Sequence, residues 1–285
     1  MDDIAERSPV AATALGDHRA DDRLDDVDAA ARIRIRETFI DYRETLAAID
    51  RGELSRANQV DAALLHNEIE STLFELGTFE EWAWNPLHYV RLSGNAIYGL
   101  LSRDFAPLEE RLASAASRLE QLPRFFAQAR KSLQPERAPK IHAETAIRQN
   151  RGLITIIDAM IVPRLAELSA ETRERLEAAI ETAQTAITEH QVWLEEELLP
   201  RANGDFRIGA ELYDRKLAFA LNSSLSRRQI RTLAEREYEL VRNEMYEIAK
   251  QVYVRTNPYT AFPDNPDEAY KQAIIRAALE KAYRE

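Results

Sequence analysis

Residues 108–133 read LEERLASAASRLEQLPRFFAQARKSL and carry the clearest structural signal in the chain. Apolar side chains recur there at alternating intervals of four and three residues, at Leu108, Leu112, Ala115, Leu119, Leu122, Phe126, Ala129 and Leu133. This spacing places one apolar stripe along an α-helix. Pro123 lies inside the stripe, and proline removes a backbone donor, so we expect a kink or a join of two helices there.

The same periodicity extends over most of the remaining sequence. It predicts further helices within residues 25–51, 55–76, 86–101, 141–168, 170–199, 210–221, 226–254 and 267–283. No stretch alternates polar and apolar residues as a strand would, and only eight of the 285 residues are glycine. We therefore expect an all-α fold, an array of about eight to ten antiparallel helices joined by short loops.

The first 24 residues are expected to form an extended N-terminal segment, followed by a single helical domain over residues 25–285. The segment runs into the polar stretch Gly16–Asp26, GDHRADDRLDD. Its aspartates lack the turning glycine and the closing glutamate of an EF-hand calcium loop. We therefore interpret the stretch as the approach to a helix, with Arg19 and Arg23 pairing with the aspartates.

Composition narrows the choice of partners and compartment. The formal net charge is −11, and such a surface repels a phosphate backbone, so we expect no nucleic-acid partner. The absence of cysteine excludes disulfides, thiolate nucleophiles and zinc–thiolate sites. The acidic start Met1–Glu6 is unlike a secretory signal, and the most apolar stretch, Leu153–Val162, is too short to span a bilayer. We expect a cytoplasmic protein without a membrane partner, a removed export signal being the alternative.

The densest group of aromatic and polar side chains lies around the sequence Trp84-Asn85-Pro86. Tryptophan and tyrosine combine apolar faces with polar tips, a mixture that is typical of pocket linings. The candidate ligand-binding residues are Trp84, Asn85, His88 and Tyr89, with Trp82 beside them. The alternative is a helix–helix junction whose polar groups bond to one another. Pro86 is suited to the first position of the next helix.

The sequence predicts no catalytic residue and no metal ligand. The histidines are His18, His66, His88, His142 and His190. None of them occurs in His-Glu-x-x-His or Glu-x-x-His, the spacings of zinc helices and di-iron bundles. Glu195-Glu196-Glu197 is interpreted as a solvated helix face, and no serine lies in a nucleophile elbow. We therefore expect no cofactor in this chain.

Several strings, taken in order, together resemble the bacterial family named domain of unknown function 885 (DUF885). They are PVAATALGDHRADDRLDD (9–26), WNP (84–86), RDFAPLEER (103–111), ETAI (144–147), DFRIG (205–209) and RNEMY (242–246). Their order and their spread over nearly the whole chain make the resemblance more specific than any single string.

The resemblance implies a largely helical protein that is similar to zinc metallopeptidases. Family members typically continue for a comparable length, and that later part carries a His-Glu-x-x-x-x-His-His-like zinc signature, which no position of this chain matches. The chain thus resembles the amino-terminal half of a metal-dependent hydrolase, forming a cleft wall, with zinc expected only in the carboxy-terminal part. It is either a fragment or a short homologue that lost the chemistry. The alternative function is a stand-alone helical scaffold that binds a ligand or another protein without catalysis.

The late helices are expected to carry the surface that meets such a carboxy-terminal half, or a second copy of the chain. Sequential elements usually neighbour each other in space. The loops and helices of this region hold an unusual number of aromatic side chains, Tyr253, Tyr259, Phe262 and Tyr270. Burial of the large apolar area of an aromatic ring is strongly stabilising, which favours an interface there. A peptide or small molecule is the other expected partner.

Overall fold

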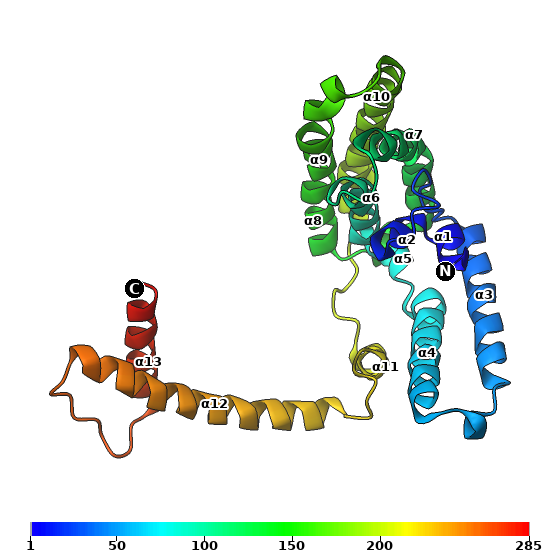
Figure 1. Cartoon of the computed structure of the whole chain (residues 1–285). Coiled ribbons are helices and arrows are strands. Elements are labelled where there is room, and N and C mark those ends of the chain that lie inside the picture. Colours follow the sequence, from blue (N-terminus) through cyan, green and yellow to red (C-terminus); the bar gives the residue numbers. More distant parts are fainter. Residues whose placement is uncertain (1, 285) are drawn as a thin grey trace. The chain divides into compact units, whose positions relative to one another are not determined.

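The computed structural model describes residues 2–284, and helices joined by loops make up its regular secondary structure. No strand occurs among these residues, so the all-α prediction is confirmed. The helices in Figure 1 are α1 (Asp2–Arg7), α2 (Pro9–Leu15), α3 (Ala29–Ala47), α4 (Arg56–Phe74), α5 (Glu81–Trp84), α6 (Pro86–Leu101), α7 (Leu108–Ser132), α8 (Lys140–Asn150), α9 (Gly152–Met160), α10 (Ala170–Trp193), α11 (Ala210–Leu221), α12 (Arg227–Thr256) and α13 (Glu268–Ala282). Of these described helices, none is both long and apolar enough to cross a membrane.

The contacts within the chain form two compact units, Met1–Asn222 and Ser223–Glu285. The sequence predicted a single helical domain over residues 25–285. Whether the two units fold together as one domain is not tested by their contacts, so the single domain stays a prediction. The N-terminal segment differs from the extended form that we expected, because it contains α1 and α2. These helices are too short to show a periodic stripe. Pro9 begins α2, and Gly16 ends it in the left-handed conformation with φ +88°.

The main core of the first unit lies where α7 packs against α10 and α6. The predicted stripe of α7 is fully buried from Leu112 to Ala129. The helix runs unbroken through Pro123, so the join of two helices that we considered there does not occur. Leu119 and Phe126, on either side of the proline, are completely buried. Their packing offsets the backbone hydrogen bond that proline cannot donate.

Helices α3 and α4 form an antiparallel hairpin with a small core of its own (Figure 1). The Asp28 carboxylate accepts the backbone N–H of Ala31 at 2.7 Å and thereby caps the start of α3. Ser55 caps α4 in the same way. The side chains buried between the two helices are Phe39, Leu46, Ala62 and Ile69.

The second unit consists of α12 packed against α13. Ser226 and Gln229 form a reciprocal capping box that begins α12. The buried side chains are Tyr246, Ala249, Ile274, Ile275 and Ala278, and Tyr253, Phe262 and Tyr270 pack against them. Three of the four aromatics that we assigned to an interface are therefore used inside this unit, while Tyr259 is fully exposed.

Gly204 marks a close approach between two backbone segments of the first unit. Its N–H donates to the Ala138 carbonyl at 3.0 Å, and Gly204 forms an isolated parallel bridge with Pro139. A β-carbon at this position would lie 2.0 Å from the Arg137 carbonyl oxygen. Because the obstacle is backbone, it cannot rotate aside as a flexible side chain would.

Replacing Gly204 with alanine is expected to lower the free energy of unfolding by about 2–3 kcal/mol, since one of the two segments must shift. Urea unfolding followed by circular dichroism measures the loss. The matched control is Gly94→Ala in α6, where the new β-carbon would make an ordinary 4.0 Å contact with Ile156. That change is expected to be neutral or stabilising by up to about 1 kcal/mol, because alanine favours helices over glycine. Equal losses in the two variants would show that the close approach is not the constraint.

Candidate functional site

A cavity of about 390 Å³ opens in the first unit, lined by residues of the N-terminal segment, α3, the π turn after α4, α5 and α6. Its apolar wall is formed by Val27, Ile35, Leu76, Trp82, Tyr89 and Leu92. Its polar lining consists of Arg7, Ser8, Asp25, Asp26, Arg32, Glu75, Glu81, His88 and Arg91. A concave, largely apolar space with a few polar groups is typical of a small-molecule site.

Asp25 is the most deeply placed carboxylate of this lining. Its Oδ1 accepts the backbone N–H of Val10 at 2.9 Å, and its Oδ2 accepts the Ser8 hydroxyl at 2.8 Å. Burial raises the pKa of Asp25, although both hydrogen bonds act in the opposite direction. These contacts make Asp25 a fixed part of the wall that joins the start of α2 to the polar stretch.

Arg32 extends from α3 over the indole of Trp82, with its guanidinium carbon 3.9 Å from the ring centroid. The same guanidinium donates to the Val27 carbonyl at 2.7 Å and to the Ser132 hydroxyl at 2.9 Å. Burial lowers the pKa of Arg32 from its ordinary value. The arginine therefore holds one face of the indole in place as part of the cavity wall.

The first two turns of α6 bring His88, Tyr89 and Arg91 to the cavity. Tyr89 is completely buried, and its hydroxyl donates to the Trp82 carbonyl at 2.6 Å. Burial raises the pKa of Tyr89 to about 12, so the phenol stays protonated. Burial also lowers the pKa of His88, which favours the neutral imidazole. The side chains of His88 and Arg91 make no hydrogen bond or ion pair with another described residue.

The four predicted ligand-binding residues separate into two pairs. His88 and Tyr89 line the cavity, together with Trp82. Trp84 instead donates its indole N–H to the Phe79 carbonyl at 3.0 Å and packs against His142. Asn85 caps α6 by accepting the Leu87 N–H, and donates to Glu81. Trp84 and Asn85 thus have the contacts of a helix junction, and ligand binding by the cluster stays a prediction.

Arg32 and Arg91 line the cavity but were not among the residues predicted from the sequence. Arg32 lies some fifty positions before Trp82 in the sequence, and only the packing of α3 beside α5 brings the two together. Arg91 follows His88 by three residues on α6, which places both on one side of that helix. This spacing is the one signal that could have added Arg91 to the candidates.

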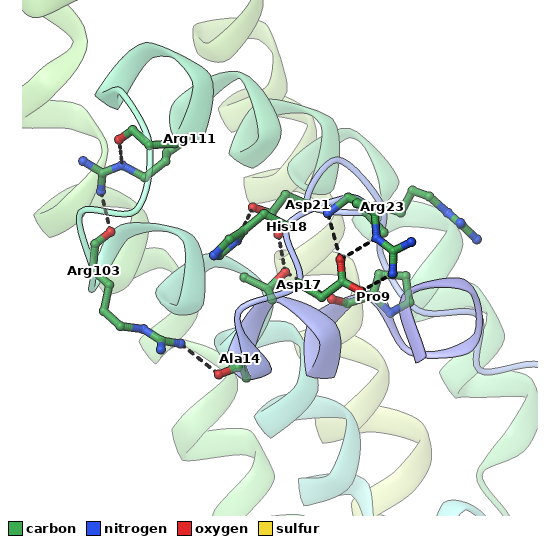
Figure 2. Close-up of polar contacts among 12 residues, drawn as sticks. Pro9, Ala14, Asp17, His18, Asp21, Arg23, Arg103 and Arg111 are labelled. Carbon is green, nitrogen blue, oxygen red and sulfur yellow. Dashed lines mark hydrogen bonds and ion pairs between the residues drawn. The ribbon is translucent and has the colours of Figure 1, made fainter. Parts of the chain in front are cut away.

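Polar contacts hold the N-terminal segment against the rest of the first unit (Figure 2). His18 Nδ1 lies 2.9 Å from Asp21 Oδ2, and the imidazole stacks on Phe105 at a centroid distance of 3.6 Å. Arg103 donates to the Ala14 carbonyl at 3.1 Å. The stretch thus contacts the α6–α7 loop as well as α7.

At the centre of these contacts is Arg118 of α7, which is completely buried. Its guanidinium donates to the Arg23 carbonyl at 2.9 Å, to the Ala96 carbonyl at 2.7 Å and to the Thr13 hydroxyl at 2.6 Å. Asp21 lies 3.9 Å away and compensates the charge. Burial lowers the pKa of Arg118, while Asp21 and Asp25 raise it.

The expected pairing within the polar stretch occurs in part. Arg19 pairs with Asp17 at 2.7 Å, and this hydrogen bond lowers the pKa of Asp17 to about 2. Arg23 instead donates to the Glu6 carbonyl. Two further aspartates face arginines of α7, since Asp21 lies near Arg118 and Asp26 pairs with Arg124. The stretch therefore has ion pairs both within itself and with α7.

The histidines of the described residues do not converge. No group of three or more histidine or acidic side chains that could hold a metal ion is found in this part of the chain. His190 lies in the main core, completely buried and stacked on Phe126 at a centroid distance of 4.4 Å. Neither of its ring nitrogens has a hydrogen-bond partner among the described residues.

The second unit exposes apolar side chains on one side of α12, interspersed with the exposed Glu237 and Glu244. Leu233, Leu240, Val241 and Ile248 are exposed, and their spacings of seven and eight residues place them on one side of the helix. The opposite side of α12 packs against α13 through Tyr246 and Ala249. Nothing within the described residues of this unit covers the exposed face, which we call the α12 face below.

The chain is similar to one protein family and to a solved structure. The family model described as a bacterial protein of unknown function, DUF885, matches residues 9–285. A solved structure, "a putative lipoprotein of unknown function from Shewanella oneidensis", is 27% identical, with a TM-score of 0.81. The match covers 98% of this chain and 50% of that one, so the chain spans about half the length of this relative. No curated protein matches the chain.

Proposed function

Because the chain belongs to the DUF885 family of bacterial proteins of unknown function, we propose that it forms the amino-terminal helical wall of a zinc-metallopeptidase-like hydrolase. In this proposal the zinc ion and the general base belong to a second half of the protein. That half would correspond to the part of the Shewanella oneidensis relative that this chain does not cover. In such an enzyme a metal polarises the carbonyl and activates water, while the wall shapes the cleft and excludes solvent.

The observation that carries the proposal is the difference in length. The chain matches a solved relative over 98% of itself at a TM-score of 0.81, yet accounts for only half of that relative. A part of a larger fold should expose apolar surface where the other part packs. The α12 face fits this expectation, since its leucine, valine and isoleucine side chains have no cover within their own unit. We propose that the second half binds there.

The test replaces two residues of the α12 face with charges. The variant L240D/I248D is expected to lose affinity for the second half of a family member produced as a separate chain. It should also bind less of a hydrophobic dye, because apolar surface drives both processes. Analytical ultracentrifugation and dye fluorescence measure the two effects. The matched control is L64D/L65D on α4, since these leucines are 51% and 55% exposed, against 56% and 55% for Leu240 and Ile248.

Mixtures of the chain with the separately produced second half also test which of the two halves carries the catalytic residues. The chain alone should not hydrolyse a peptide library, while the assembled halves should do so in a zinc-dependent manner that L240D/I248D abolishes. Turnover by the chain alone, removed by a single substitution within it, would contradict the proposal. So would a chain that remains a monodisperse monomer without dye binding at high concentration, because the α12 face would then need no partner.

The rival proposal is a stand-alone scaffold that binds a ligand without catalysis. The cavity beside α6 favours this hypothesis, because all of its lining residues belong to this chain. For both the hydrolase and the scaffold proposals, a cytoplasmic location with neither nucleic acid nor membrane as partner stays our prediction. Locating the protein by cell fractionation would test it directly.

A further inference from the structure

We propose that the cavity beside α6 binds a small carboxylate that carries an apolar body. The carboxylate is placed at His88 and Arg91, and the apolar body between Trp82 and the aliphatic wall. This assignment does not rest on the proposed hydrolase, because every residue it uses belongs to the first unit.

The carboxylates that line the cavity are already engaged by the protein. Asp26 pairs with Arg124, and Glu75 pairs with Lys216 of α11. Glu81 accepts a hydrogen bond from Asn85 at 2.6 Å, and Asp25 accepts two from the start of α2. A cationic ligand would have to compete with these contacts, so the lining does not favour one.

The donors on α6 are not engaged. The side chains of His88 and Arg91 make no hydrogen bond or ion pair with any other described residue, and the two residues lie one helical turn apart on the same side of α6. A neutral imidazole can donate one N–H, and a guanidinium offers a planar set of donors that matches a carboxylate. The position between them therefore suits an anion with two acceptor oxygens.

The remaining wall suits an apolar body of limited size. The indole of Trp82 is held in place by Arg32 on its face and by its own N–H, which donates to the Leu76 carbonyl at 3.1 Å. Ile35, Leu76 and Leu92 complete the apolar lining. A volume of about 390 Å³ is near the lower end of typical ligand pockets. An acid with one aromatic ring or short alkyl chain matches this space.

The experiment titrates the full chain with 3-phenylpropionate and with its uncharged amide, 3-phenylpropanamide. Isothermal calorimetry should give a dissociation constant on the order of 1 mM for the acid. The amide should bind at least about tenfold more weakly, because it lacks the charge that strengthens both hydrogen bonds. NMR titration of His88 gives a second readout, since a bound carboxylate favours the imidazolium and should raise the pKa of His88.

Two variants locate the site. Arg91→Gln and His88→Phe should each weaken binding of the acid about tenfold. The control is Arg173→Gln, an exposed arginine of α10 outside the cavity lining, which should leave binding unchanged. Equal binding of acid and amide, equal effects of the Arg91 and Arg173 variants, or no binding of the acid would each overturn the assignment. The hydrolase proposal would survive these results, because its test depends on the α12 face.

Discussion

Replacing His190 with phenylalanine is expected to stabilise the protein. The variant should also lose less stability than the wild type when the pH is lowered. His190 is completely buried in the main core, and both ring nitrogens lack a partner among the described residues. A buried polar atom without a partner costs about 1–3 kcal/mol of desolvation. Phenylalanine keeps a flat ring to stack with Phe126 and Trp193 and buries no polar atom. Near pH 8 we expect a gain of about 1 kcal/mol or more.

The effect grows as the pH falls. Burial lowers the pKa of His190 from 6.5 to about 3, and the charge of Arg130 acts in the same direction. Between these two values the unfolded chain binds a proton that the folded chain does not. Titration of His190 therefore leaves the stability of the wild type unchanged above pH 6.5 and lowers it as the pH falls below this value, by about 1.4 kcal/mol per pH unit. At pH 5 the wild type should have lost about 2 kcal/mol that the variant keeps.

Urea unfolding at a series of pH values measures this difference directly. Carboxylates also titrate in acid, so the informative quantity is the variant's free energy of unfolding minus that of the wild type. The matched control is His66→Phe, at an exposed position on α4. A difference for the His190 variant that stays constant between pH 8 and pH 5 would show that the core histidine does not titrate as described.

The sequence predicted the helices well because their signal is local. The stripe of residues 108–133 recurs every turn, and the structure buries nearly all of it in one helix. Cap positions are local as well, and Ser55, Pro86 and Ser226 begin their helices as expected. The short helices α1 and α2 escaped detection, since six or seven residues hold too few turns to establish a period.

The cavity could be predicted only in part, because its lining comes from segments far apart in the sequence. Aromatic residues clustered around Trp84 drew attention to the right region, and His88 and Tyr89 do line the cavity. Whether a tryptophan lines a pocket or fills a junction depends on long-range packing, which spacing does not encode. Trp82 and Trp84 lie two residues apart, yet only Trp82 reaches the cavity.

The role of the polar stretch was also misjudged for a physical reason. We interpreted the stretch as the approach to a helix in which Arg19 and Arg23 pair with the aspartates, but Asp21 and Asp25 are buried. The partners that make burial possible lie about a hundred residues later, on α7. Arg111 and Arg118 are both buried and stand seven residues apart, on the same side of that helix. Two arginines at such spacing beside an apolar stripe are the signal that a buried polar network is present.

Replacing Arg118 with methionine is expected to cost about 3–5 kcal/mol of stability, one of the largest losses available in this chain. The guanidinium supplies hydrogen bonds to the Arg23 and Ala96 carbonyls and to the Thr13 hydroxyl, and methionine supplies none. The change also removes the buried arginine whose charge compensates the buried Asp21 carboxylate. Lysine at the same position keeps the charge but cannot make the forked set of bonds, so Arg118→Lys should recover only part of the loss.

Thermal unfolding and limited proteolysis of residues 1–24 measure the two consequences, which are lost stability and release of the N-terminal segment. The matched control is Arg175→Met, since Arg175 pairs with Glu120 of α7 through two 2.8 Å bonds but remains exposed. An exposed pair contributes at most about 1 kcal/mol, because water already solvates both charges. Adding Asp21→Asn to Arg118→Met should recover stability, as it removes the uncompensated charge. If the Arg118 and Arg175 variants unfold with equal losses and the segment stays protected, the buried arginine does not hold the N-terminal segment in place.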